Sequence, residues 1–145
     1  MVEPFEIRRR GSIYFAVGIA AVILAGACAI DAYAAPEPLL WILVVVLVVI
    51  AYFHLIAALD ARTPLFVADD QGVRLRDGHE WVGYLWQEMG DIRVERREGI
   101  AHDARVKVVS GDGHRIYTAP LGFATNATPS DAEVQLANRR SAAAY

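Results

Sequence analysis

The chain has 145 residues, of which 55% are hydrophobic and 21% are charged, and its mean hydropathy is +0.30. This composition is too apolar for an ordinary soluble domain of this size. A formal charge of −3 argues against a nucleic-acid-binding protein, and the single cysteine, Cys28, excludes an intramolecular disulfide and a thiolate zinc cluster. Most of the apolar excess precedes residue 60, so we expect a lipid-facing half followed by a water-facing half.

Two apolar segments, residues 12–34 and 39–59, are each long enough to cross a hydrocarbon core. At about 1.5 Å per residue, a helix of about 20 residues spans about 30 Å, the thickness of that core. The short connection between the segments contains Pro36 and Pro38, and prolines break a helix and favour a tight turn. We therefore predict a transmembrane helical hairpin over residues 12–59.

Arginines flank the two outer ends of this hairpin, and the connecting turn has none. Arg8–Arg10 precede the first segment, and Arg62 follows the second. Because cytoplasmic flanks of membrane helices accumulate Lys and Arg, we expect both termini to be cytoplasmic, with residues 1–11 as a cytoplasmic N-terminal segment. A cleaved signal peptide is the alternative, since Ala32–Ala34 resembles a small-residue cleavage site that follows a basic N-terminal region.

The first apolar segment carries small residues at spacings of three and four. The stripe runs along one helix face through Gly18, Ala21, Ala25, Ala29 and Ala32. Small residues let helix backbones approach closely in lipid. The second segment is bulky, so packing of small against large residues inside the hairpin is the favoured interpretation. The alternatives are docking on a helix of another protein and self-association into a homo-oligomer.

From residue 63 onward the pattern changes to short alternating runs separated by Gly and Asp, which is typical of antiparallel strands. We predict strands over residues 65–68, 73–76, 80–86, 91–97, 105–109 and 114–119, in a small curved sheet or open barrel. A helix should follow over residues 131–140, with Ser130 and Glu133 as a capping box, and a frayed tail over 141–145. The predicted fold class is an α+β membrane protein with a β domain over residues 63–140.

Several of these segments together resemble a known family. They are the hairpin PLFVADDQGVRL over residues 64–75, the turn Trp86-Gln87-Glu88-Met89, and the alternating strand that begins at Asp91. With the two apolar helices, they resemble the membrane-anchored bacterial pleckstrin-homology-like (PH-like) proteins over most of the chain. The resemblance implies an antiparallel β domain with a closing helix, tethered to the bacterial inner (cytoplasmic) membrane. Its motifs are structural and imply no chemistry.

The sequence contains no pattern that predicts catalysis. No Gly-rich loop opens a helix, and no Ser or Cys lies in a nucleophile elbow. The histidines outside the apolar segments, His79, His102 and His114, lack the spacing of a helix-borne metal site. We therefore expect a protein that is not an enzyme and that has no cofactor, metal or small-molecule substrate.

A basic stripe is the one suggestive electrostatic feature. It consists of Arg93, Arg97, Arg105 and Lys107, which alternate with the apolar residues of the fourth and fifth predicted strands. If these strands pair, the four cations share a solvent-facing surface that would suit anionic lipid headgroups or an acidic partner. Glu95 lies within the stripe, so a solvated face of mixed charge is the favoured alternative.

The third predicted strand, residues 80–86, carries aromatic residues on both of its faces. Trp81 and Leu85 share one alternation parity, whereas Val82, Tyr84 and Trp86 share the other, so one set must face outward unless a partner covers it. Open edges of a small sheet also accept a partner strand through backbone hydrogen bonds. Both features favour protein binding.

These observations predict a non-catalytic accessory, scaffold or assembly subunit of a larger membrane protein complex. Its partners would be membrane lipids and other integral membrane protein subunits. The connection over residues 60–64 reaches at most about 17 Å, so the β domain would lie against the headgroups. The alternatives are a module that binds anionic lipid and a self-associating regulator.

Overall fold

A computed structural model of the protein describes residues 2–96 and 104–145. The chain forms two units, one over Arg10–Arg62 and one that combines Met1–Arg9 with Thr63–Tyr145. The first unit contains helices α1 (Gly11–Ala34) and α2 (Pro38–Asp60). The second contains helix α3 (Pro129–Ala143) and seven strands, which are β1 (Phe5–Ile7), β2 (Phe66–Ala68), β3 (Gly72–Asp77), β4 (Glu80–Leu85), β5 (Met89–Glu95), β6 (Arg105–Ser110) and β7 (Ile116–Pro120).

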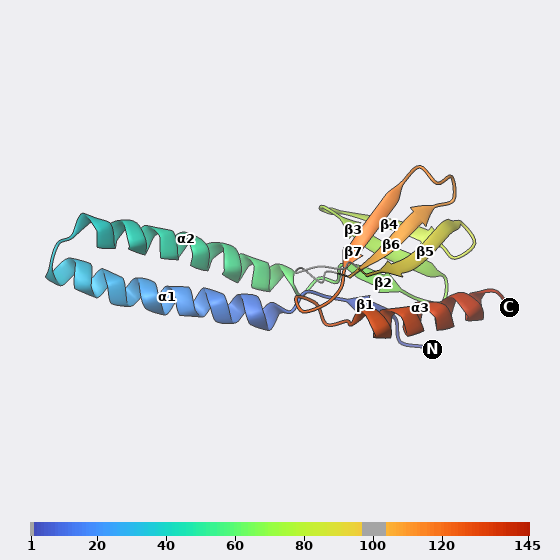
Figure 1. Ribbon diagram of the computed structural model, residues 1–145, viewed down its shortest axis with the longest axis horizontal. Helices are drawn as coiled ribbons and strands as arrows, with labels where there is room; N and C mark the ends of the chain where they lie inside the picture. The colour runs from blue at the N-terminus through green and yellow to red at the C-terminus, as the bar shows by residue number, and fades with distance from the viewer. Residues whose placement is uncertain (1, 97–103) are drawn as a thin grey trace. The chain divides into compact units, whose positions relative to one another are not determined.

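Helices α1 and α2 form an antiparallel pair (Figure 1). The helices have 24 and 23 residues, and both are long and apolar enough to cross a membrane. Pro38 occupies the first turn of α2, where its missing N–H costs no hydrogen bond. The predicted helical hairpin is therefore present, and no helix bound differs from the prediction by more than one residue.

The small-residue stripe of α1 lies on the face that meets α2. Gly18, Ala21, Ala25 and Ala32 are buried within this unit, and Ala29 is half-buried. A Cβ atom built on Gly18 would lie 2.8 Å from Cδ2 of Leu55, which is closer than side chains approach one another. The stripe therefore contacts bulky residues of its own hairpin.

Replacing Gly18 by Leu should force α1 and α2 apart, because the new side chain would overlap Leu55. Overpacking of this kind costs about 1–3 kcal/mol. Gly26 in the same helix has no atom within 4 Å of the corresponding Cβ position, so Gly26→Leu is a matched control. Pulsed electron-spin distances between labels at Ile23 and Val46, in a background without the native cysteine, should lengthen only for Gly18→Leu. Equal distances in the two variants would contradict this packing.

The strands form two antiparallel sheets, a four-stranded sheet in the order β1-β2-β3-β4 and a three-stranded sheet in the order β5-β6-β7. The six predicted strands are all present, although their ends shift. The last strand starts at Ile116 and not at His114, because the turn before it uses the backbone of both preceding residues. The His114 N–H donates to Asp112 Oδ1 at 3.0 Å, and the Arg115 N–H donates to Ser110 Oγ at 3.0 Å.

Strand β1 was not predicted. The prediction placed residues 1–11 in a segment outside the β domain, but Phe5 pairs with Ala68 and Ile7 pairs with Phe66. The pairing with β1 continues one residue before β2, since the Leu65 N–H donates to the Ile7 carbonyl at 2.7 Å. Three residues are too few to show a strand period, and the arginines that follow them dominate the local pattern. The helical hairpin is consequently an insertion between two neighbouring strands of one sheet.

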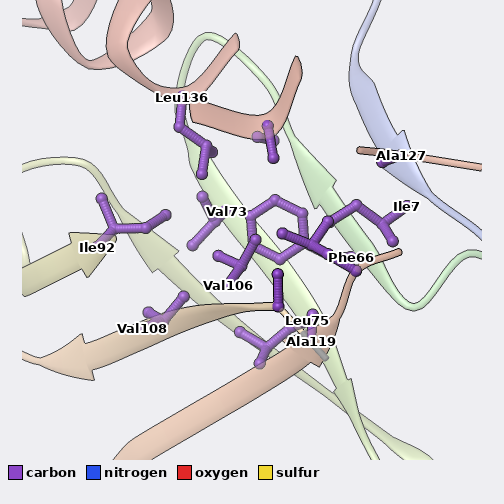
Figure 2. Close-up of a cluster of buried hydrophobic side chains, with 14 residues drawn as sticks. Ile7, Phe66, Val73, Leu75, Ile92, Val106, Val108, Ala119, Ala127 and Leu136 are labelled. Atoms are coloured by element: carbon purple, nitrogen blue, oxygen red, sulfur yellow. The ribbon is translucent and has the colours of Figure 1, made fainter. Parts of the chain in front are cut away.

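The core of the β unit lies between the sheets and α3 (Figure 2). Ile7 and Phe66 have no exposed surface, and Ala132 and Leu136 of α3 pack into the same cluster. Figure 2 shows Phe66 among labelled side chains of both sheets and of α3. The remaining members of the cluster are Ala68, Val73, Leu75, Ile92, Ala104, Val106, Val108, Ala119, Leu121 and Ala127.

Helix α3 begins earlier than predicted. The prediction of Ser130 as the N-cap is wrong, because Thr128 occupies that position and its Oγ1 accepts a hydrogen bond from the Asp131 N–H at 3.2 Å. Pro129 takes the first helical position, where its fixed φ and missing N–H are favourable. The helix also continues to Ala143, so most of the predicted tail over residues 141–145 is helical. Alanine is the strongest helix former, which explains this extension.

Candidate functional site

The residues of the predicted basic stripe are brought together by the pairing of β5 with β6. Arg93 lies opposite Lys107, and Glu95 lies opposite Arg105. The alternating residues Ile92, Val106 and Val108 point into the core. Arg97, the fourth residue of the stripe, lies outside the described residues.

Glu95 lies at the centre of this cluster and binds all three described cations. Its Oε2 accepts from Nε of Arg105 at 3.0 Å, and its Oε1 accepts from Nζ of Lys107 at 3.2 Å and from Nη2 of Arg93 at 3.3 Å. Asp91 adds a second carboxylate 3.8 Å from Nη1 of Arg93. The surface is therefore a mixed-charge network, in which much of the positive charge is offset internally.

This network also changes the acidity of Glu95. Hydrogen bonds from Arg105 and then from Lys107 stabilise the ionised form and hold the pKa of the Glu95 carboxyl below its ordinary value of 4.5, although desolvation acts in the opposite direction. The pKa is thus lower in the folded chain than in the unfolded chain. The ion pairs consequently stabilise the fold fully above pH 4.5, and this contribution is lost as the pH falls through the folded-state pKa.

Glu95→Gln should destabilise the protein near neutral pH, and the difference from the wild type should shrink as the pH falls below 4.5. Urea unfolding in detergent at a series of pH values between about 7 and 3 measures this change, since each titration gives a free energy of unfolding. Asp91→Asn is the control, because the one ion pair of Asp91 with a described residue is the 3.8 Å contact with Arg93. A difference between Glu95→Gln and wild type that does not vary with pH would contradict the assignment.

A groove of about 650 Å³ runs between β5 and α3. Apolar side chains of both elements form much of its lining, and charged side chains border it. The lining residues are Ile92, Arg93, Val94, Glu133, Leu136, Ala137, Arg140, Ser141 and Ala144. Sequence reasoning missed this groove, although its helical residues recur at spacings of three and four, which places them on one face of α3.

One ion pair connects the end of β5 to the first turns of α3. Nη2 of Arg96 lies 3.1 Å from Oε2 of Glu133 and donates to Oγ of Ser130 at 3.3 Å. Ser130 and Glu133 thus take part in a contact between the strand and the helix, and they do not form the capping box predicted for them. Arg140, two turns further along α3, has no hydrogen bond or ion pair with the described residues.

Strand β5 is an edge strand of the described part of its sheet. It pairs with β6 on one side, and no described strand pairs with its other side. An edge strand presents backbone N–H and C=O groups that another chain can bind. The groove therefore combines an apolar lining with a free strand edge.

The aromatic residues of β4 and of the turn after it lie on the two sides that their alternation predicts. Tyr84 of β4 and Trp86, which directly follows β4, are half-buried against the core, and Nε1 of Trp86 donates to the Asp69 carbonyl at 3.0 Å. Trp81 and Leu85 form the outward set, with exposed fractions of 47% and 50%. This outer face of β4 is a second apolar surface. It is separate from the groove between β5 and α3, because neither Trp81 nor Leu85 lines that groove.

The described residues contain no group of three or more His, Cys, Asp or Glu side chains that could hold a metal ion. His102 lies outside the described residues. Polar contacts in the described turns serve the backbone. The Ser110 hydroxyl donates to Asp112, and this bond, followed by the His114 N–H, lowers the pKa of the Asp112 carboxyl. These contacts stabilise the turn between β6 and β7. They lie outside the groove between β5 and α3, whose lining forms a surface for binding.

Comparisons with protein-family models, with curated proteins and with solved structures found no match to this chain.

Proposed function

We propose that the protein is a non-catalytic, membrane-anchored accessory or assembly subunit, which binds a larger membrane protein complex through a cytoplasmic PH-like domain and its helical hairpin. The observation that carries the proposal is the groove between β5 and α3, in which an apolar lining borders a free strand edge. Protein-binding sites that use strand addition combine these two elements. The proposed location is the bacterial inner membrane.

The pairing of β1 with β2 supports the hairpin as a retained anchor. Ile7 lies before α1, and its partner Phe66 lies after α2, so both ends of the hairpin return to one folded unit. A hairpin that enters a membrane and returns leaves its two ends on the same side, as this pairing requires. Cleavage after Ala34 would remove β1 and the fully buried Ile7, which argues against a signal peptide.

The strand order supports the PH-like proposal. A series of antiparallel strands is followed by a closing helix, and Ala132 and Leu136 of that helix pack into the core. The turn at Trp86–Glu88 leads into an alternating strand, as the resemblance implies. The connections to the hairpin are also short, and their limited reach would confine the domain to the membrane surface.

Purification of the full-length tagged protein from its native cells in mild detergent, with mass spectrometry of the bound subunits, tests this function. We expect integral membrane proteins to co-purify in fixed stoichiometry. Ala137→Trp should remove them, because Ala137 lines the groove. Val134→Trp is the matched control, since Val134 is exposed on the same helix and does not line the groove. Recovery of the wild type as a free monomer would contradict the proposal.

Binding of anionic lipid is a second candidate function, which the cluster of Arg93, Arg105 and Lys107 favours. A fragment that starts at Thr63 would lack β1, so the test requires residues 2–9 joined to residues 63–145 by a short linker. If this function holds, flotation with vesicles that contain phosphatidylglycerol should exceed flotation with phosphatidylcholine alone, and changing the three cations to Ala should abolish the excess. Equal flotation with the two vesicle types would exclude this candidate.

A further inference from the structure

The lining of the β5–α3 groove is continuous with the core of the β unit. Ile92 and Leu136 belong to the buried cluster and also line the groove, and Val94 packs against that cluster. Ala137 and Ala144 are small, and they leave space above this apolar surface. A side chain that enters the groove would therefore bury apolar area against residues that the fold already holds in place.

The strand edge determines the form that an occupant should take. Asp91–Glu95 pair with β6 on one side, and no strand of the described part of the chain pairs with their other side, which therefore offers backbone hydrogen bonds beside the groove. No proline interrupts this stretch, and proline is a residue that blocks strand addition. An extended segment would pair with this edge, and every second side chain would turn toward α3.

The charges around the groove select the occupant further. The carboxylates there are already matched by cations, since Glu133 binds Arg96 and Glu95 binds Arg105 and Lys107. Arg140 lines the groove and has no matching carboxylate among the described residues. Among residues 2–96 and 104–145, the positive charge of Arg140 on the α3 side of the groove is thus not matched by a carboxylate, and an acidic side chain would complement it.

We propose that the groove binds an extended acidic segment of a partner protein, which adds as a strand to β5. Alternate apolar side chains of this segment fill the space above Leu136 and Ala137, and an Asp or Glu carboxylate binds Arg140. This inference rests on the proposed protein-binding function and gives the chemistry of the partner. It is independent of which membrane complex the partner belongs to.

The test uses full-length protein in nanodiscs and a phage-displayed library of random 12-residue peptides. Selected peptides should combine alternating apolar residues with at least one Asp or Glu. Ala137→Trp should weaken their binding at least tenfold, and Val134→Trp should leave it unchanged. Arg140→Glu should also weaken it about tenfold, which corresponds to about 1.4 kcal/mol, whereas the control Arg115→Glu, which changes an exposed arginine outside the groove, should not.

Two further measurements identify the mode of binding. Replacement of the peptide's acidic residue by Lys should restore binding to Arg140→Glu, because the charge pair is reversed and not removed. Hydrogen exchange of the β5 amides should slow when the wild-type peptide binds, because strand addition pairs them. Rescue together with protection would support both the charge contact and the backbone contact.

Other outcomes would overturn the inference. Peptides without acidic residues, or peptides whose affinity is the same for Ala137→Trp and wild type, would exclude the proposed occupant or the proposed groove. Dimerisation that Ala137→Trp abolishes would assign the groove to a second copy of the chain. The co-purification experiment tests the proposed function separately. If a stable membrane complex co-purifies with Ala137→Trp as well, the protein binds its partners through another surface, and only the groove inference is contradicted.

Discussion

Ile7→Asp is expected to unfold the β unit under conditions in which the wild type is folded. Ile7 has no exposed surface and pairs with Phe66 in the core. Loss of a buried aliphatic side chain costs about 2–5 kcal/mol, and a buried carboxylate without a partner adds a desolvation penalty. The total is about 4 kcal/mol or more, which is a large part of the stability of a typical domain, about 5–15 kcal/mol.

Urea unfolding in detergent measures this effect on the β unit, in a Trp41→Phe background so that the fluorescence comes from Trp81 and Trp86. Val2→Asp is the control, because Val2 precedes the same strand and has an exposed fraction of 70%. The control should unfold at the wild-type urea concentration, whereas Ile7→Asp should already be unfolded without urea. A wild-type midpoint for Ile7→Asp would show that β1 is not part of the sheet.

Gly72→Ala should have an effect of similar size on the pairing of β3 with β4. A Cβ atom at residue 72 would lie 2.0 Å from the Tyr84 carbonyl oxygen and 2.8 Å from Cα of Leu85. These are backbone atoms of the neighbouring strand, so no rotamer change relieves the overlap, and the strands must separate. We expect a loss of about 3 kcal/mol, at the upper end of the usual cost of overpacking.

Gly83→Ala is the matched control for this substitution, because Gly83 lies in the same strand pair. Its Cβ would meet Cγ of Arg74 at 3.4 Å, an ordinary van der Waals contact. Gly83→Ala should therefore change the free energy of unfolding little, and the gain in strand propensity should offset part of any cost. Equal destabilisation by the two substitutions would contradict the close approach at Gly72.

Much of this fold was predictable from the sequence, because long periodic patterns carry strong signals. The helical hairpin and six of the strands follow from apolar runs, prolines and alternation. Strand β1 was not predictable, since Phe5–Ile7 is too short for a period and pairs with residues far along the chain. The cap of α3 was misplaced because Ser130 and Glu133 match a capping box, whereas Pro129 moves the helix start to Thr128.

The candidate site was predictable only in part. Alternation placed Arg93, Arg105 and Lys107 on one face, but it did not give the three bonds by which Glu95 offsets them. The groove required the packing of α3 beside β5, which is a tertiary contact with no local pattern. Arg140 belongs to the site only through that contact, so the sequence pattern around it does not distinguish it from other helix-end arginines.

The position of the hairpin between β1 and β2 has a consequence for biosynthesis. A ribosome completes Ile7 long before Phe66, and the intervening chain must close on itself before the two residues can pair. The entropy of closing a long loop opposes this step, and a formed hairpin removes most of that cost by bringing the loop ends together. We expect assembly of the sheet to wait for the hairpin, so a molecule in which the hairpin does not form would leave the edge of β2 without its partner β1.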